Sequence, residues 1–269
     1  MQGFQETLAA RTSLRPVQPE IELGPLDLQT FGICFAAAFL IAAAVLGRRL
    51  KELGKPPDWA YEVIFAGLIG GLIGSRVDYL IQNWDDVSDD LLGNIFSGSG
   101  LVWFGGLVGG AIAVLLWARW RGWLGLQLLD ACAVPLAVGY AIGRIGCQLS
   151  GDGDYGVESD LPWAMAYPEG TEPTTEEVHP TPVYETAAMG FVALVLWRLR
   201  DRFAPGVLFA LYLVLSGIER LLVEFIRRND EVVAGLTLAQ LVSLATIAAG
   251  AAFLLARRRA LEARPPEIA

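Results

Sequence analysis

Histidine, cysteine and charge are all scarce in this sequence of 269 residues. His179 is the single histidine, so no second imidazole is present to complete a histidine metal site. The three cysteines, Cys34, Cys132 and Cys147, show no short spacing, which gives neither a disulfide framework nor a metal-binding pattern. We therefore expect no metal and no cofactor. Charged residues make up only 18% of the chain, below the roughly one quarter usual in soluble domains, so lipid is the expected solvent.

Long apolar stretches take the place of the missing charge. A helix needs about 20 residues to cross the roughly 30 Å hydrocarbon core of a bilayer. The sequence therefore predicts an all-α membrane protein with about seven transmembrane helices. Their expected spans are residues 28–47, 60–81, 101–118, 124–146, 182–199, 205–224 and 236–256.

Basic residues collect at alternate ends of these stretches. Lys and Arg favour the cytoplasmic side of short loops, so the N-terminus is expected outside the cytoplasm and the C-terminus inside it. The opposite loops are acidic, and residues 152–177 contain no Lys or Arg. The basic residues concerned are Arg48, Arg49, Lys51, Lys55, Arg119, Arg121, Arg198, Arg200, Arg202, Arg257, Arg258, Arg259 and Arg264, and the acidic ones begin with Asp85, Asp86, Asp89 and Asp90.

The predicted organisation has a membrane domain, two tails and a cap. Residues 1–27 form an extracytoplasmic tail, residues 28–256 the membrane domain and residues 257–269 a cytoplasmic tail. Between the fourth and fifth helices, residues 150–178 are too long for a simple loop and carry aromatic residues, so they predict a small extracytoplasmic cap. The first 23 residues lack the apolar core of a cleavable signal peptide, so the first membrane helix is expected to direct insertion.

Closely spaced glycines mark the second and third predicted helices. Small residues four positions apart let helix backbones approach closely in lipid, so we expect tight packing there. Space for a lipid beside the backbone is a second interpretation. The glycines are Gly67, Gly70, Gly71, Gly74, Gly105, Gly106, Gly109 and Gly110.

Three arginines, Arg76, Arg144 and Arg220, fall inside or at the outer ends of predicted helices. An isolated arginine in the membrane costs about 3 kcal/mol on insertion scales, so each needs a partner. For any one of them, a structural ion pair or a side chain reaching the interface is sufficient. Three in the outer half of the bundle favour a buried anion site, where guanidinium forks match a lipid phosphate. The candidate carboxylate partners are Asp78, Glu185, Glu219 and Glu224.

A glycine-rich motif lies where the fourth helix meets the cap. Gly-Arg-Ile-Gly-Cys at residues 143–147 precedes a Gly/Asp loop from Gly151 to Gly156 that includes Asp152. Glycine lets backbone amides approach an anion closely. The loop lacks the glutamate and the spacing of a calcium-binding loop, so a calcium site is a poor interpretation.

A second motif, His-Pro-Thr-Pro-Val-Tyr-Glu at residues 179–185, starts the fifth helix. Its prolines suit a helix start, Tyr184 suits the aromatic belt, and Glu185 in the first turn complements the helix dipole. Alternatively, His179 and Glu185 are acid–base or substrate-orienting groups beside the arginines. Periodicity does not choose between these interpretations.

Taken in order, these motifs resemble those of a known family, the prolipoprotein diacylglyceryl transferases. Residues 143–146 resemble its Gly-Arg-x-Gly signature, residues 74–76 its Gly-Ala-Arg element, and residues 220–227 its Arg-Phe-x-x-Glu-Phe-x-Arg element. The 151–156 loop, the Asp-Leu-Pro-Trp stretch at 160–163 and the 179–185 motif follow in the same order. The match runs from about residue 24 to residue 228, and the order of these elements is more specific than any one of them.

The resemblance implies an enzyme that moves the diacylglyceryl group of phosphatidylglycerol to the lipobox cysteine thiol of a prolipoprotein signal peptide. A thioether forms and glycerol phosphate leaves. It also implies a multi-pass protein of the bacterial cytoplasmic membrane, surrounded by the lipid bilayer and without a nucleic-acid partner. The implied catalytic residues are Arg144, Arg220 and Glu185, and the implied substrate-binding residues are Arg144, Arg76, Tyr184, His179, Asp152, Gly151 and Gly156.

The sequence departs from the family pattern at several positions. The histidine that members commonly carry before Gly-Gly in the third helix is Phe104 here. A histidine and a tyrosine at the start of the first helix are Gln29 and Phe31, Cys147 stands where asparagine is common, and the loop after Gly151 is one residue longer. If the third-helix histidine is the general base for the thiol, this chain lacks it. An arginine cluster that favours the thiolate is one replacement.

Three other functions fit parts of the sequence and rank below the transferase. A non-catalytic or altered-substrate paralogue would bind an anionic lipid with the same arginines. A transporter would use the intramembrane arginines, but no repeated halves or pairs of broken helices are visible. A thiol acyltransferase would use Cys147 and His179, although a free cysteine at a helix end is more often a packing residue.

Overall fold

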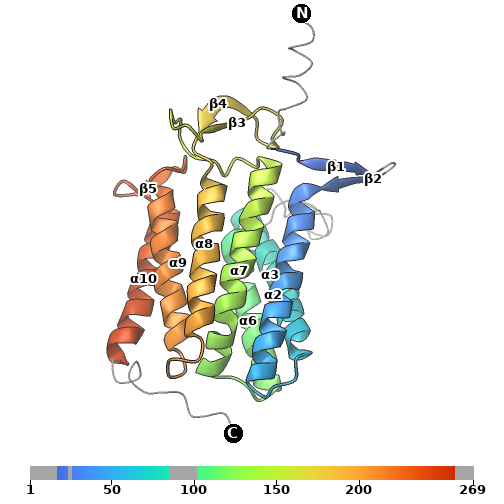
Figure 1. The fold of residues 1–269 in the computed structure, drawn as a ribbon, viewed down its shortest axis with the longest axis vertical. Coiled ribbons are helices and arrows are strands. Elements are labelled where there is room, and N and C mark those ends of the chain that lie inside the picture. Colours follow the sequence, from blue (N-terminus) through green and yellow to red (C-terminus); the bar gives the residue numbers. More distant parts are fainter. Residues whose placement is uncertain (1–16, 24–25, 85–101, 258–269) are drawn as a thin grey trace, which may run out of the picture. The chain divides into compact units, whose positions relative to one another are not determined.

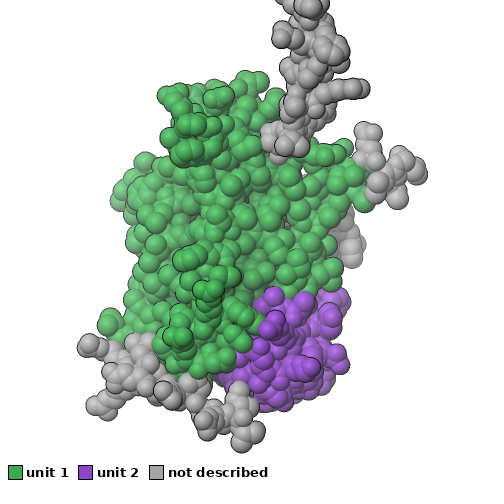
Figure 2. Space-filling view, viewed as in Figure 1, with its two compact units in different colours: residues 1–42, 132–267, 269 green, residues 43–131, 268 purple. Residues whose placement is uncertain are grey.

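The protein is described from a computed structural model, which covers residues 17–23, 26–84 and 102–257 for description. The chain forms two compact units (Figure 2). The first unit comprises residues 1–42, 132–267 and 269, and the second unit comprises residues 43–131 and 268. Most of both predicted tails lies outside the described residues, as do these predicted loop charges: Asp85, Asp86, Asp89, Asp90, Arg258, Arg259 and Arg264.

Seven α-helices fill most of the described residues, and each lies on one predicted apolar stretch (Figure 1). Four of them, α2, α3, α7 and α10, are long and apolar enough to cross a membrane, and α6 is a shorter apolar helix. The fold is therefore that of a helical membrane protein. The helices are α2 (Thr30–Glu52), α3 (Trp59–Gln82), α6 (Trp103–Trp120), α7 (Leu126–Ser150), α8 (Thr181–Leu199), α9 (Val207–Glu224) and α10 (Leu238–Ala256).

Three short antiparallel hairpins accompany the helices, and no sequence signal indicated them. Strands β1 (Glu20–Leu23) and β2 (Leu26–Gln29) precede α2, so this helix begins at Thr30 rather than at residue 28. Strands β3 (Met165–Tyr167) and β4 (Thr174–Val178) lie between α7 and α8. Strands β5 (Glu231–Val233) and β6 (Leu236–Thr237) join α9 to α10.

In the second unit, α3 and α6 pack through their glycines. A Cβ atom built on Gly70 would lie 2.6 Å from the carbonyl oxygen of Gly109, and one on Gly74 would lie 2.8 Å from the Cα of Gly109. Only glycine permits this approach, which confirms the packing interpretation of the motif. Asp78, a candidate arginine partner in the sequence, accepts a hydrogen bond from the backbone N–H of Gly105 at 2.9 Å. It thereby pairs one of the N–H groups that the start of α6 leaves without a partner inside the helix.

In the first unit, α8 packs on α9 and α9 packs on α10 (Figure 1). Pro180 is the N-cap residue of α8 and Pro182 lies in its first turn, as the motif predicted. Helix α10 begins with a capping box in which Thr237 and Gln240 satisfy each other's backbone N–H groups. These two starts fix the ends of α8 and α10 nearest to the buried charges described below.

The segment between α7 and α8 is folded around a small core of its own. Tyr155 and Tyr167 stack with ring centroids 4.9 Å apart, and Val17 and Val178 are buried against them. The backbone N–H of Gln18 donates to the carbonyl of Leu149 at 2.7 Å, which joins the segment before β1 to the end of α7. Residues 151–180 connect α7 to α8 and overlap the predicted cap of residues 150–178, and we refer to residues 151–180 as the cap from here on.

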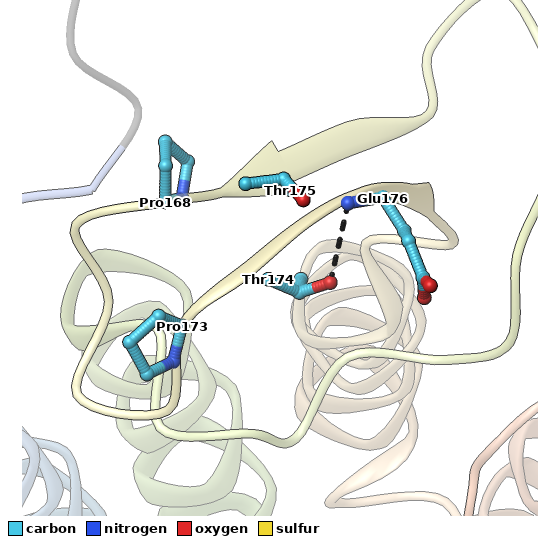
Figure 3. A pocket seen from close by; sticks show the side chains of 5 residues that line it. All are labelled: Pro168, Pro173, Thr174, Thr175 and Glu176. Carbon is cyan, nitrogen blue, oxygen red and sulfur yellow. Dashed lines mark hydrogen bonds between the residues drawn. The ribbon is translucent and has the colours of Figure 1, made fainter.

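The β3–β4 hairpin also lines an open pocket (Figure 3). Its lining contains one carboxylate and no cation, so it offers no charge for a phosphate. Inside it, the Glu176 backbone N–H donates to the Thr174 hydroxyl at 3.3 Å. The lining residues are Pro168, Pro173, Thr174, Thr175 and Glu176.

Candidate active site

Three arginines of the first unit converge on the fully buried carboxylate of Glu185 in α8. Arg144 Nε lies 3.2 Å from Glu185 Oε2, and Arg220 Nη1 lies 3.1 Å from Oε1. Arg227, three residues beyond the end of α9, places Nη1 3.4 Å from Oε2. A carboxylate with no solvent exposure needs such compensation, because burying an unpaired charge costs several kcal/mol.

Tyr140 completes the contacts of Glu185. Its hydroxyl donates to Glu185 Oε1 at 2.8 Å and accepts from Arg144 Nη2 at 3.3 Å. The guanidinium of Arg144 also lies over the Tyr140 ring, 5.0 Å from its centroid. Tyr140 and Arg144 are four residues apart in α7 and so share one helix face.

Asp154, in the cap, bridges two of the arginines. One oxygen of its carboxylate pairs with Arg144 and the other with Arg227. Burial alone would raise the pKa of Asp154, but these two guanidiniums hold it below its usual range. The cap thus supplies an anion between two cations at the end of α7.

Backbone hydrogen bonds fix the Asp154 loop in this place. The N–H of Gly156 donates to the carbonyl of His179 at 2.8 Å, and the N–H of Val157 donates to the carbonyl of Ile226 at 2.9 Å. The loop is therefore joined both to the start of α8 and to the segment after α9. A Cβ atom on Gly156 would lie 3.0 Å from that of His179, which leaves room only for glycine.

Glu224 anchors Arg220 from the other side. Arg220 Nη2 lies 2.9 Å from Glu224 Oε2, four residues further along α9. The other oxygen of Glu224 accepts hydrogen bonds from Thr237 Oγ1 and Asn229 Nδ2, both at 2.7 Å. The N-cap residue of α10, Thr237, therefore positions the carboxylate of Glu224, which in turn pairs with Arg220. We call Arg144, Arg220, Arg227, Glu185, Asp154, Glu224 and Tyr140 the arginine network.

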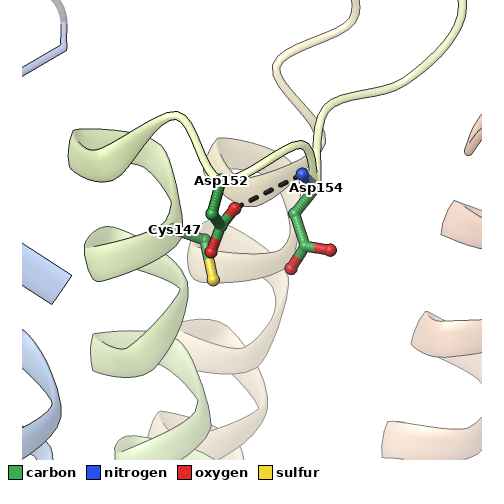
Figure 4. A group of neighbouring side chains, drawn as sticks. All are labelled: Cys147, Asp152 and Asp154. Carbon is green, nitrogen blue, oxygen red and sulfur yellow. Dashed lines mark hydrogen bonds between the residues drawn. The ribbon is translucent and has the colours of Figure 1, made fainter. Parts of the chain in front are cut away.

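Several predicted site residues lie close to this network. Gly151 ends α7 with a positive φ of 58°, and its N–H donates to the Cys147 carbonyl at 2.9 Å. Asp152 accepts from the backbone N–H of Asp154 at 3.3 Å (Figure 4). Burial raises the pKa of Asp152, and the charge of Asp154 adds to that effect. The carboxylate paired with Arg144 is that of Asp154, although the sequence had directed attention to Asp152.

Cys147, Asp152 and Asp154 bring their ligand atoms within 4.8 Å of one another (Figure 4). Both oxygens of Asp154 already face guanidiniums, and Cys147 Sγ lies 3.8 Å from Arg144 Nη1. The cluster is therefore part of an ion-pair arrangement rather than an open set of ligands for a cation.

His179 and Tyr184 form a separate group at the start of α8. His179 Nδ1 lies 3.4 Å from the Tyr184 hydroxyl, which also accepts from Trp163 Nε1 at 2.8 Å. Glu185 is the fifth residue of α8, so its expected place in the first turn was wrong, and its charge serves the arginines rather than the helix dipole. Arg76 belongs to the second unit, where it is buried with its guanidinium 5.1 Å from the ring centroid of Tyr79.

Sequence reasoning missed three members of the network: Tyr140, Asp154 and Arg227. Arg227 follows a helix rather than lying in one, so it does not stand out as a charge within an apolar stretch. Asp154 lies in the same Gly/Asp loop as Asp152, the residue that the motif had indicated. For Tyr140 the signal was present, because it precedes Arg144 by one helical turn.

The fold and the network define a class: a helical membrane protein with partly buried arginines held on carboxylates beside a small cap. The sequence profile described as prolipoprotein diacylglyceryl transferase matches residues 18–256. A phosphatidylglycerol–prolipoprotein diacylglyceryl transferase of Clostridium tetani is 32% identical over 234 residues, which are 85% of this chain and 93% of that protein. Proteins of the same name from Chromohalobacter salexigens and a Nostoc species are 34% identical (89% and 91% covered) and 30% identical (90% and 90% covered). The chain therefore belongs to the prolipoprotein diacylglyceryl transferase family.

Proposed function

We propose that this protein transfers the diacylglyceryl group of phosphatidylglycerol to the lipobox cysteine thiol of a prolipoprotein. A thioether forms and glycerol phosphate leaves, the first step of lipoprotein maturation. The observation that carries the proposal is the meeting of Arg144, Arg220 and Arg227 at one buried carboxylate in a member of this family. Guanidinium groups held at fixed positions suit a phosphodiester whose negative charge grows as the leaving group departs.

In this mechanism Arg144 and Arg220 bind and polarise the phosphate, and Glu185 keeps both forks in place. Because arginine donors are fixed before the reaction, they stabilise developing charge without reorganisation. Tyr184, His179 and Asp152 border the path of the substrates, and Gly151 and Gly156 shape the loop beside Arg144. The chemistry requires no metal and no cofactor.

The proposed topology places the reaction at the outer face of the bacterial cytoplasmic membrane. Seven transmembrane helices, an N-terminus outside and a C-terminus inside follow from the alternation of basic and acidic loops. The cap would then meet the signal peptide of an exported prolipoprotein on the side where its lipobox emerges.

Complementation tests the transfer reaction directly. The chain is expressed in bacteria depleted of their own transferase, and a lipoprotein precursor is followed by mass. A diacylglyceryl mass gain on the lipobox cysteine is expected with the natural chain. Arg144→Ala should abolish it, and Arg144→Lys should restore little, since lysine keeps the charge and loses the planar fork.

A second candidate function is favoured by one observation, the phenylalanine at position 104 where family members commonly carry histidine. A paralogue without transferase activity would bind an anionic lipid through the same arginines. Abundant, membrane-inserted protein that binds phosphatidylglycerol but adds no mass to the precursor would support this candidate over the transferase.

A further inference from the structure

Glu219 is a buried carboxylate that the arginine network does not use as an anchor. It lies in α9 directly before Arg220 and is only 7% exposed. Its Oε1 is buried without any hydrogen-bond partner among the described residues. A buried polar atom without a partner costs about 1–3 kcal/mol, more if charged, and such groups concentrate at functional sites.

The surroundings of Glu219 place it inside the same electrostatic field. Its charge interacts with those of Glu185, Arg144, Arg220 and Arg227. The charge of Glu219 also interacts with the hydroxyl of Tyr140, which donates a hydrogen bond to Glu185. Helix α10, which packs on α9, contributes no titratable side chain. Glu219 therefore lies within electrostatic range of the arginine network without forming an ion pair or hydrogen bond with it among the described residues.

The other carboxylates of the site have their oxygens committed. Glu185 receives Tyr140 and Arg220 on Oε1 and Arg144 and Arg227 on Oε2. Asp154 faces one arginine with each oxygen. Glu224 Oε1 accepts two hydrogen bonds, and its Oε2 lies 2.9 Å from Arg220 although the angle does not suit a hydrogen bond. Among these four carboxylates, Glu219 alone offers an oxygen with no cation or donor on it.

We propose that Glu219 is a catalytic residue that accepts the proton of the substrate thiol. This inference rests on the proposed function, in which a cysteine must lose its proton to become a nucleophile. The S–H bond breaks and its proton passes to a Glu219 carboxylate oxygen. The sulfur forms a bond to the glyceryl carbon, and the bond between that carbon and the ester oxygen of the phosphate breaks, with its electron pair remaining on the oxygen of the departing glycerol phosphate. The proton then leaves Glu219 with the phosphate, which restores the carboxylate.

Selenocysteine provides a test that separates a proton acceptor from a structural residue. The full-length protein in phosphatidylglycerol vesicles is given two synthetic lipobox peptides, one with cysteine and one with selenocysteine, whose selenol is already ionised at neutral pH. Glu219→Gln keeps the size of the side chain and removes its basicity. With the cysteine peptide we expect the kcat of the Glu219→Gln protein to fall about 100-fold or more, the usual range for a lost general base. The KM for lipid should change little. With the selenocysteine peptide we expect its rate to return to within about tenfold of the natural protein.

Matched controls keep the result interpretable. Glu62→Gln, in α3 of the second unit, makes the same chemical change on a carboxylate whose partners, Trp117 and Arg121, are not members of the network, and it should leave both rates unchanged. Glu219→Asp, which keeps a carboxylate, should retain part of the cysteine activity and serves also if the glutamine variant does not fold. A folded Glu219→Gln protein with undiminished cysteine activity, or with equal losses on both peptides, would overturn the role of Glu219. Absence of product from the natural protein with both peptides would instead refute the transfer reaction, and this role with it.

Discussion

Helices α3 and α6 in the second unit meet through glycine, whereas α7, α8 and α9 in the first unit meet around buried charge. The first arrangement brings backbones together and gains dispersion contacts, the usual source of helix association in lipid. The second places arginines and carboxylates where water is scarce, which costs free energy unless every charge is matched. Packing alone explains the glycine contacts. The cost of burying charge needs a further explanation, and binding of a substrate phosphate provides it.

The two units also differ in how their ion pairs are exposed. In the second unit, Glu62 pairs with Arg121, and both side chains are about one third exposed, at 33% and 32%. In the first unit, Glu185 is fully buried under its arginines. Exposed pairs contribute little to stability, while loss of one member of a buried pair is strongly destabilising. The same substitution in both places therefore measures what burial adds.

The largest effect on stability is expected from Glu185→Gln. The variant keeps the shape of the side chain and leaves three guanidiniums facing a neutral group, so the free energy of unfolding should fall by about 3–5 kcal/mol. Glu62→Gln is the matched control and should have a much smaller effect. Unfolding in mixed detergent micelles measures both. Equal losses in the two variants would show that burial of the Glu185 pairs contributes nothing.

The glycine contact should give the next largest effect. Gly74→Leu forces a side chain against the backbone of Gly109, so α3 and α6 must separate, at a cost of about 1–3 kcal/mol. Gly190→Ala in α8 is the control, because a Cβ atom there meets nothing within 4 Å. It should be neutral or stabilise by up to about 1 kcal/mol through helix propensity. The same unfolding assay applies, and a stable Gly74→Leu protein would contradict the close packing.

Much of the fold was predictable from the sequence because lipid imposes a simple rule on it. The seven helices of the described residues all fall on the apolar stretches, since a backbone in hydrocarbon must satisfy its own hydrogen bonds. The hairpins were not predictable, because strands of two to five residues carry too little pattern. The β5–β6 turn illustrates this: Ala234 and Gly235 both adopt positive φ, a turn that only its glycine suggests.

The site was predictable in part for the same reason. Arg144, Arg220 and Glu185 stand out because charge is rare in apolar stretches, and the structure brings these three together. Asp154 and Arg227 lie in loops, where charge is ordinary, so only the three-dimensional arrangement distinguishes them. Sequence spacing also does not reveal which carboxylate oxygen lacks a partner, as Glu219 shows.

A smaller effect is expected at Thr237, which connects a helix cap to the arginine network. Its hydroxyl accepts from the Gln240 N–H at 3.2 Å and donates to Glu224, the partner of Arg220. Thr237→Val keeps the shape and removes both bonds, which should cost about 1–2 kcal/mol and raise the KM for phosphatidylglycerol a few-fold. Thr237→Ser should behave as the natural protein. A loss of stability without any change in KM would mean that the cap of α10 does not position Arg220.

The smallest change in KM is expected at Asp154, where a substitution should improve lipid binding and lower stability. Its carboxylate occupies the space between Arg144 and Arg227 where an anionic substrate would also be attracted. Asp154→Asn removes this competitor, so the KM for phosphatidylglycerol should fall about two- to fivefold, the effect of less than 1 kcal/mol. Asp201→Asn is the control, because Asp201 is 56% exposed and pairs with Arg200, which is not a member of the network. A higher KM in Asp154→Asn would show that Asp154 positions the arginines rather than competing for them.

Stability should fall in the same variant, because Asp154→Asn loses two ion pairs. The pH dependence of this loss identifies its cause. The two guanidiniums hold the pKa of Asp154 below its usual value near 4, so its ion pairs stabilise the folded protein above about pH 4. That contribution is lost as the pH falls through the depressed pKa. The difference in unfolding temperature between the natural protein and Asp154→Asn should therefore be present at pH 7 and shrink below about pH 4. A difference that is independent of pH would assign it to lost packing instead, because only the charged form of Asp154 attracts the arginines.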